Sequence, residues 1–430
     1  MDYTFIIGKM IEEYRKNKPI YQHMRNYFDG KHDIYTNGKF KIRPGSSDRP
    51  THCNWISKFI SEEIAYGLNQ PLTFKSKSDN KQIVADVLAA MEHFKLNHDQ
   101  KLMKDLEIYG LCYAVYYFDK KGRFCERILS PLDGIAYTDE EGKAVLFIHF
   151  FNKKYDTADY YNVYFPDGHI DQYKDDVLIG SVDTGFSFCP VTVVQMEEAE
   201  TIYAKIRNLN DDYNELLSNQ QALISEYKNA YMTICAENQS VTEGVVNALR
   251  DENAGIITYP TAGGKPEWLI KNINDTAIRN QLQEIKENLY AQSGHIDFNE
   301  KLSSNLSGVA LQSRLTGLDQ RVNSVLNVVI DAIYDRIYAI CWDLQRKRSK
   351  DYNATDIRIE SNVDIPMDVN SRVNEAVQLS NIVSLKTRLE RLPFIENADA
   401  EIERLAQEQK NNKKLASTKL NDAFYGGASA

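Results

Sequence analysis

Histidine and cysteine are the residues of this sequence best suited to bind a metal or to act as nucleophiles, and they are widely scattered. There are eight histidines and six cysteines in 430 residues, and no C-x-x-C pair occurs. The closest histidine pair, His93 and His98, lies in the polar stretch MEHFKLNHDQ between two helical patterns. Such a stretch is typical of a surface connection and lacks the ligand spacing of a zinc site. We therefore predict no metal site and reduced, mostly buried cysteines.

Motifs for phosphate binding and for hydrolysis are also missing. The nearest match to a phosphate-binding loop, Gly263-Gly264-Lys265, is followed by Pro266 where Ser or Thr is required. Neither G-x-S-x-G nor H-E-x-x-H is present. His295 is predicted to be a helix-end residue rather than a general base, and the acidic pairs Asp175-Asp176 and Asp211-Asp212 to be solvated surface. The sequence thus predicts no catalytic site, no metal and no cofactor.

Composition and charge exclude further classes. Hydrophobic residues make up 43% and charged residues 26%, which is typical of a globular protein of several domains. A net charge of -10 argues against a protein that coats nucleic acid by releasing counterions. No apolar run reaches the roughly 18 residues that a membrane-spanning helix needs, and we expect no signal peptide at the start of the chain.

The N-terminal 196 residues combine helical and strand patterns. Apolar residues recur at helical spacing in 1–30 and in NWISKFISEEIAYGLNQPLTF (54–74), and Asn37-Gly38 is a hairpin signal. From about 107 to 195 the pattern changes to alternating aromatic and β-branched residues, with turns rich in Asp, Gly and Lys. We interpret residues 1–196 as one α+β domain with an antiparallel sheet.

Three long helical patterns follow, at 197–228, about 274–294 and 307–348. An insert between the first two contains the strand-like pieces AYMTICAE and GIITYPTAGG and a short helical piece, TEGVVNALRD. TDIRIESNVDIP reads as a later strand, and the remainder is mainly helical. Gly317 is a plausible kink point in the third helix, because glycine weakens a helix interior.

The stretch NEKLSSNLSG (299–308) interrupts the second and third helical patterns with small polar residues that cannot pack a core. The helices around it differ in charge. The first pattern has seven acidic and three basic residues, whereas the third is rich in bases and ends in RKRSK. Bases at a helix C-terminus suit the helix dipole, which favours a structural role over a binding patch. From composition alone, 299–308 fits either an ordinary surface loop or the lining of a pore.

Several segments, in their order along the chain, resemble the portal proteins of tailed bacteriophages, and specifically the family of the Bacillus phage SPP1 portal. They are YFDGKHDI (27–34), NWISKFISEEIAYGLNQPLTF (54–74), IRNLNDDYNELLSNQQALISEYKNAYM (206–232), SGVAL (307–311) and the stretch from 364 to 408. The resemblance implies an α+β portal fold assembled as a ring, typically of twelve subunits. It implies these parts: wing 1–196, first stem helix 197–230, clip 231–272, second stem helix 273–296, tunnel loop 297–306, long helix and returning wing strand 307–366, and crown 367–430.

The same resemblance implies roles for particular residues and partners. The tunnel loop would present to DNA the residues Asn299, Lys301, Ser303, Ser304 and Asn305. The stem interface would use Ile278, Leu282, Ile285 and Leu289. The implied partners are double-stranded DNA passing through the ring, the terminase large subunit, a head-completion or connector protein, and the major capsid and scaffolding proteins. The protein would be located at a capsid vertex of the virion after assembly in the host cytoplasm, with no membrane partner.

Two other functions are compatible with parts of the sequence. A metal-dependent nucleic-acid-processing enzyme would place an α+β catalytic domain in 1–196, but it would require a carboxylate cluster for Mg²⁺ that the sequence does not reveal. Another virion connector or adaptor ring is the third reading. The order helix, small module, helix favours the portal over this third possibility.

Overall fold

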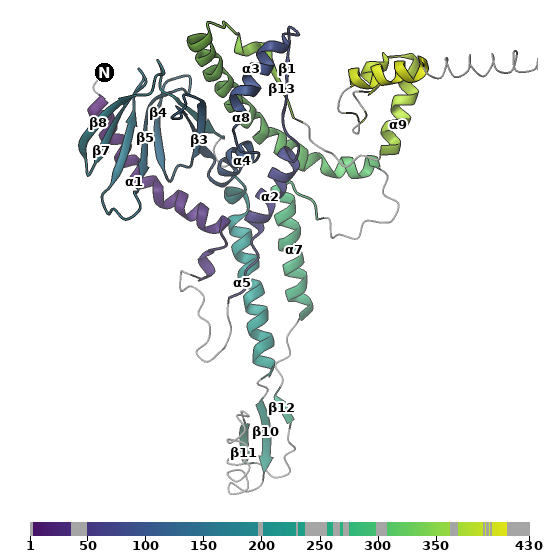
Figure 1. The fold of residues 1–430 in the computed structure, drawn as a ribbon. Coiled ribbons are helices and arrows are strands. Elements are labelled where there is room, and N and C mark those ends of the chain that lie inside the picture. Colours follow the sequence, from purple (N-terminus) through teal and green to yellow (C-terminus); the bar gives the residue numbers. More distant parts are fainter. Residues whose placement is uncertain are drawn as a thin grey trace, which may run out of the picture. The chain divides into compact units, whose positions relative to one another are not determined.

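The computed structural model describes residues 3–35, 50–196, 201–228, 231–236, 256–260, 267–269, 275–297, 308–361, 369–389 and 398–410, together with Leu392 and Ile395. The chain divides into two compact units (Figure 1). The first contains residues 1–301 and 314–363, and the second contains 302–313 and 364–430. The fold mixes helices and sheets, as the sequence predicts.

The first unit begins with helices and then builds two antiparallel sheets. Its helices are α1 (Tyr3–Phe28), α2 (Trp55–Leu68), α3 (Lys81–Met91) and α4 (His98–Tyr109), with a short 3₁₀ turn at Asp33–Tyr35. One sheet has the order β3-β2-β9, with β2 (Leu111–Phe118), β3 (Phe124–Leu129) and β9 (Val191–Gln195). The other has the order β4-β5-β6-β7-β8, with β4 (Gly134–Thr138), β5 (Ala144–Phe151), β6 (Tyr160–Tyr164), β7 (His169–Lys174) and β8 (Val177–Asp183). The predicted antiparallel strands are therefore present, in two sheets rather than one; the predicted hairpin at Asn37-Gly38 lies outside the described residues.

Aromatic and aliphatic side chains fill the spaces on both sides of the larger sheet. On one side Met10 and Tyr14 of α1 pack against Leu146 and Val163. On the other, side chains of the smaller sheet meet Phe147 of the larger one. Gly134 is required at the start of β4, because a Cβ atom there would lie 2.5 Å from the Phe147 ring.

Two long helices leave this α+β region and pack against each other. These are α5 (Ile202–Lys228) and α7 (Asp275–Ser293), and Figure 1 shows them side by side. They are joined to the N-terminal helices by a buried cluster, named here the helical core, which contains Tyr27, Trp55, Ile56, Phe59, Ile60, Ile108, Tyr109, Ile202, Ile206, Leu289 and Tyr290. Along the chain between α5 and α7 lies a small sheet of order β11-β10-β12, with β10 (Tyr231–Ala236), β11 (Ile256–Pro260) and β12 (Glu267–Leu269). The two predicted strands are present, and the predicted short helix in 242–251 lies outside the described residues.

The third predicted helix is α8 (Gly308–Arg348), which forms without interruption. After a 3₁₀ turn at Ala354–Asp356, β13 (Ile357–Glu360) pairs antiparallel with β1 (Thr73–Ser76). This pairing returns the chain to the N-terminal region. The second unit contains α9 (Val369–Gln378), a 3₁₀ turn at Leu379–Asn381, α10 (Leu385–Leu389) and a helical segment at 398–410. Among the described residues, no helix combines the length and the apolar content needed to cross a membrane.

Candidate functional site

The predicted stem residues fall into two groups along α7. Leu289 is fully buried in the helical core, and Ile285 packs against the same cluster. Ile278 and Leu282, farther from that core along the helix, are only half-buried within the single chain. The apolar surface that a single chain leaves available on α7 therefore lies nearer its N-terminal end.

The five predicted loop residues, Asn299, Lys301, Ser303, Ser304 and Asn305, lie outside the described residues. Two described segments, one before residue 298 and one after residue 313, are named here the loop limbs. The first limb is the end of α7 with residues 294–297, and the second is α8 from Arg314 to Val322. The site can therefore be examined at the limbs.

The limbs approach each other at two glycines. Gly294 has a φ of +75°, a conformation that ends α7 and that glycine adopts at little cost. A Cβ atom on Gly317 would lie 3.2 Å from the Gly294 carbonyl oxygen. The sequence predicts Gly317 as a kink point, and the structure adds a second reason for glycine there, which is the close backbone approach to α7.

A buried group of charged and polar side chains lies beside this contact. We name Glu63, Glu107, His295 and Arg321 the junction cluster. Arg321 Nη2 donates to Glu107 Oε2 at 2.9 Å, and Arg321 Nε lies 3.4 Å from Glu63. His295 Nε2 lies 3.7 Å from Glu63 Oε1 and 3.2 Å from the Phe59 carbonyl oxygen. The cluster thus joins α2, α4, α8 and the end of α7.

Burial governs the charge of these groups. Burial, together with the neighbouring Glu107, raises the pKa of Glu63 well above its usual value, although Arg321 acts in the opposite direction. Burial lowers the pKa of His295 to about 4, so the imidazole is neutral at pH 7. The prediction that His295 is a helix-end residue agrees with its position directly after α7. Its burial against Phe59 was not predicted from the sequence, because the two residues are 236 positions apart.

A second buried ion cluster holds the middle of α8. Arg336 is 1% exposed, and its Nη2 lies 2.8 Å from Asp99 Oδ1, while its Nε contacts Glu126. Burial is the largest single influence and would raise the pKa of Glu126, but Arg336 and His98 together outweigh burial and the pKa is lowered. His98 borders this cluster with Nε2 3.4 Å from Glu126 Oε2, so it is packed against β3 rather than exposed on a surface connection. No group of metal-binding side chains occurs among the residues that the structure describes.

The basic end of α8 has a structural role, as the sequence favours. Arg346 Nη1 donates to the Gly185 carbonyl oxygen at 2.7 Å, and Lys347 Nζ donates to that of Gly122 at 2.6 Å. These bonds fasten the helix end to loops of the α+β region.

Of the acidic residues predicted as solvated surface, Asp175, Asp176 and Asp212 are exposed, and Asp211 needs a correction. The Tyr27 hydroxyl donates to Asp211 on α5, which is partly buried, and burial raises the pKa of Asp211. Asp175 and Asp176 lie in the β7–β8 turn, where Asp175 accepts from the Asp159 backbone N–H and Asp176 accepts from the Tyr161 hydroxyl. These carboxylates help to fix the fold locally.

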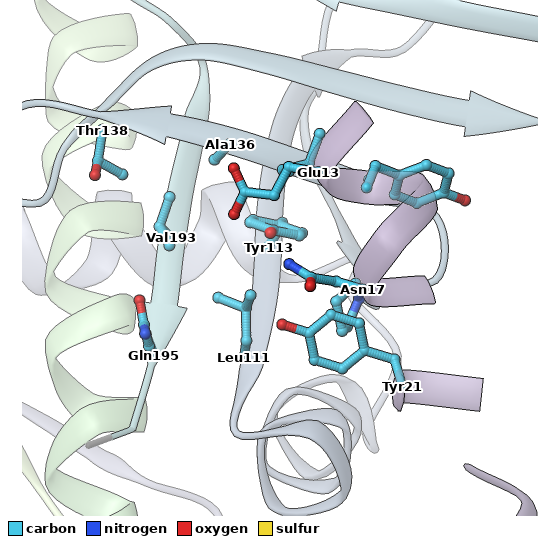
Figure 2. Close-up of a pocket in the computed structure, with 13 residues that line it drawn as sticks. Glu13, Asn17, Tyr21, Leu111, Tyr113, Ala136, Thr138, Val193 and Gln195 are labelled. Atoms are coloured by element: carbon cyan, nitrogen blue, oxygen red, sulfur yellow. The ribbon is translucent and has the colours of Figure 1, made fainter. Parts of the chain in front are cut away.

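A cavity of about 220 Å³ lies between α1 and the strands (Figure 2). Glu13, Asn17 and Tyr21 extend from α1 toward strands that include β2 and β9. The lining, which lies wholly in the described part of the chain, has no histidine, no cysteine and no second carboxylate. It does not offer the acid–base pair that a hydrolytic site would use.

Comparison with known proteins decides between the possible readings of this architecture. The family model for "Phage portal protein, SPP1 Gp6-like" matches residues 7–415. The chain belongs to this family. The portal protein of Bacillus phage SPP1 is 20% identical over 460 residues, which cover 97% of this chain and 89% of that protein. The portal role at the capsid vertex of a phage particle, predicted from the resemblance, is thereby confirmed.

Solved structures with a similar course of the chain come from gene transfer agent (GTA) particles. One is described as the neck of an empty GTA particle, with a TM-score of 0.46, 9% identity, and coverage of 86% of this chain and 92% of that one. Another is the virion of a native GTA particle, with a TM-score of 0.45, 11% identity, and coverage of 84% and 94%.

Proposed function

We propose that the portal chain assembles with copies of itself into a ring, of twelve subunits as is typical of the family, whose central channel passes double-stranded DNA into and out of the capsid. The observation that supports this proposal most strongly is the family match from residue 7 to residue 415, which includes both long helices and the small sheet between them.

The parts of the portal are assigned as the resemblance implies: wing 1–196, stem helices 197–230 and 273–296, clip 231–272, tunnel loop 297–306, long helix and returning wing strand 307–366, and crown 367–430. The packing of α5 against α7 supports the stem, and the β1–β13 pairing supports a strand that returns to the wing. The clip would dock the terminase large subunit during packaging and the connector protein afterwards.

Within the channel, small polar loop residues would slide past phosphates without holding one register. Asn299, Ser303, Ser304 and Asn305 supply weak hydrogen bonds, and Lys301 supplies one positive charge per subunit. The first stem helix has seven acidic and three basic residues, so an acidic stem lining would repel the duplex and limit sticking. If a map of the assembled ring showed a basic stem lumen, the proposal of an acidic stem lining would be contradicted.

The chain would act without catalysis, metal or cofactor, and the family is one of structural virion components. It would assemble in the host cytoplasm with scaffolding and major capsid proteins, and would remain at one vertex of the virion.

The proposal can be tested in particles assembled with and without the portal chain. We expect particles without it to contain no packaged DNA, and a tag on the complemented chain to be located at one vertex per particle by gold labelling. Labelling at many vertices, or normal packaging without the chain, would contradict the proposal. A nuclease assay with Mg²⁺ on the purified protein addresses the enzymatic alternative directly.

A further inference from the structure

One buried side chain contacts both loop limbs. Glu63, on α2, is fully buried; its Oε1 lies 3.7 Å from His295 Nε2 on the first limb, and its carboxyl group lies 3.4 Å from Arg321 Nε on the second. His295 is also held by the Phe59 carbonyl oxygen, so α2 contributes two anchors to the same limb. Helix α2, the end of α7 and α8 therefore meet at one carboxyl group.

We propose that Glu63 is a positioning residue, which holds the end of α7 and residues 314–322 of α8 against α2 and so sets where the two loop limbs lie. This inference rests on the proposed function for the loop itself. The fixing of the limbs is a property of the folded chain and can be measured without DNA.

The proton count of the junction cluster explains how so many ionisable groups are buried together. If Glu63 and Glu107 were both ionised beside Arg321 and a neutral His295, these four described groups would together carry one net negative charge, which is costly in a buried site. Glu63 Oε2 and Glu107 Oε1 are both buried and have no hydrogen-bond partner among the described atoms. A proton on Glu63 brings these four groups to zero net charge, and burial and the neighbouring Glu107 both favour that proton. The raised pKa of Glu63 agrees with this arrangement, and Lys58, on the same helix, also disfavours a charged His295.

A protonated Glu63 carboxyl group has a close chemical mimic. Glutamine has nearly the same shape and no charge, and its amide can donate to Glu107 and accept from Arg321. Alanine in the same place removes both links and leaves a cavity. The two substitutions therefore separate the loss of a charge from the loss of the contact.

The packing around the cluster leaves little room for the limbs to shift. A Cβ atom on Gly67 of α2 would lie 2.8 Å from Val322 Cγ1, and Gly317 approaches Gly294 as described above. The second limb is thus packed tightly against both α2 and the first limb. Loss of the Glu63 links should loosen the two limbs together.

The test is hydrogen exchange, measured by mass spectrometry on the assembled full-length protein at neutral pH, for Glu63→Ala, Glu63→Gln and the control Glu62→Ala. Glu62 is the neighbouring residue and forms a partly exposed ion pair with Lys58. For Glu63→Ala we expect backbone exchange at least tenfold faster in both 289–297 and 314–322. For Glu63→Gln and Glu62→Ala we expect exchange within twofold of wild type. The proposal would be overturned if Glu63→Ala accelerated exchange in only one limb or in neither. It would also be overturned if Glu63→Ala and Glu63→Gln accelerated exchange equally.

Should Glu63→Ala fail to fold, Gly317→Ala provides an independent variant, because its added methyl group presses against the Gly294 carbonyl oxygen. This variant should also accelerate hydrogen exchange in the same two segments. Exchange rates equal to those of wild type would count against the proposal. DNA packaging is the second readout. We expect it to fall at least tenfold for Glu63→Ala and to stay within twofold of wild type for Glu63→Gln. Faster exchange in the limbs with undiminished packaging would overturn the link to the channel, whereas failure of the wild type to package would refute the proposed function instead.

Discussion

Buried ionisable side chains make the stability of this protein depend on pH. His149 on β5 is 8% exposed, and burial, with a contribution from Arg127, lowers its pKa to about 4 from an ordinary value of 6.5. At pH values between about 4 and 6.5, His149 binds a proton in the unfolded chain but not in the folded chain. The stability present above pH 6.5 is therefore lost as the pH falls toward 4.

Replacement of His149 by phenylalanine should remove this dependence at one site. Between pH 7 and pH 4 we expect wild type to lose about 3 kcal/mol more unfolding free energy than His149→Phe, since one pKa unit corresponds to about 1.4 kcal/mol. Denaturant unfolding at the two pH values provides the measurement. His32 and His295 titrate in both proteins, so the difference isolates His149; equal losses would contradict the prediction.

Arg336 allows a second test at the scale of single residues. Arg336→Met leaves the buried Glu126 without its guanidinium partner, and we expect a loss of about 3–5 kcal/mol in unfolding free energy. The control Arg348→Met, at the exposed end of the same helix, should change it by less than about 0.5 kcal/mol. Adding Glu126→Gln to Arg336→Met should recover part of the loss. An unchanged denaturant midpoint for Arg336→Met would show that the ion pair contributes little to the unfolding free energy.

Such clusters could not be predicted from the sequence. Glu107 and Arg321 are 214 positions apart, and each looks locally like one more charged residue on an amphipathic helix. The pattern of a helix indicates which of its faces is polar, but not that a polar residue will be buried by another segment. The same reason explains why Asp211 was predicted as solvated.

At the scale of elements, the long helices and the strands could be predicted because each shows its own period over many residues. The three long helical patterns correspond to α5, α7 and α8. Alternation predicts a strand but not its partner, which is why two sheets appear where one was predicted. The residues predicted to face DNA lie outside the described residues, so that assignment remains a prediction.

Substitutions on α7 should separate assembly from folding. Leu282→Asp alters a half-buried position outside the helical core, so we expect it to block ring assembly with little change in the stability of the single chain. Leu289→Asp places a carboxylate in the fully buried core, so we expect it to lower the unfolding free energy by several kcal/mol and thereby also to block assembly. Size-exclusion chromatography and denaturant unfolding report the two effects. Normal rings from both variants would count heavily against the stem assignment.

The loop between α7 and α8 can be shortened without touching either helix. With 299–305 replaced by a short glycine linker, we expect rings to form as in wild type, because the helical core and the junction cluster are unchanged. Packaging or retention of DNA should fall, because the polar residues proposed to line the channel are lost. Unchanged packaging would indicate that the loop does not line the channel.

At the scale of the whole molecule, the account depends on self-association. The packing of α5 against α7 and a net charge of -10 per chain are compatible with the proposed ring, whose wall would be built from these two helices of each copy. Twelve copies would carry a total charge of about -120, which makes assembly and DNA passage sensitive to salt.

Negative-stain electron microscopy of the purified full-length protein tests the central claim most directly. The account predicts ring-shaped particles with a central stain-filled hole wide enough for duplex DNA, and class averages with a single rotational symmetry. Compact monomers without a hole, at protein concentrations where portal rings would be assembled, would contradict it.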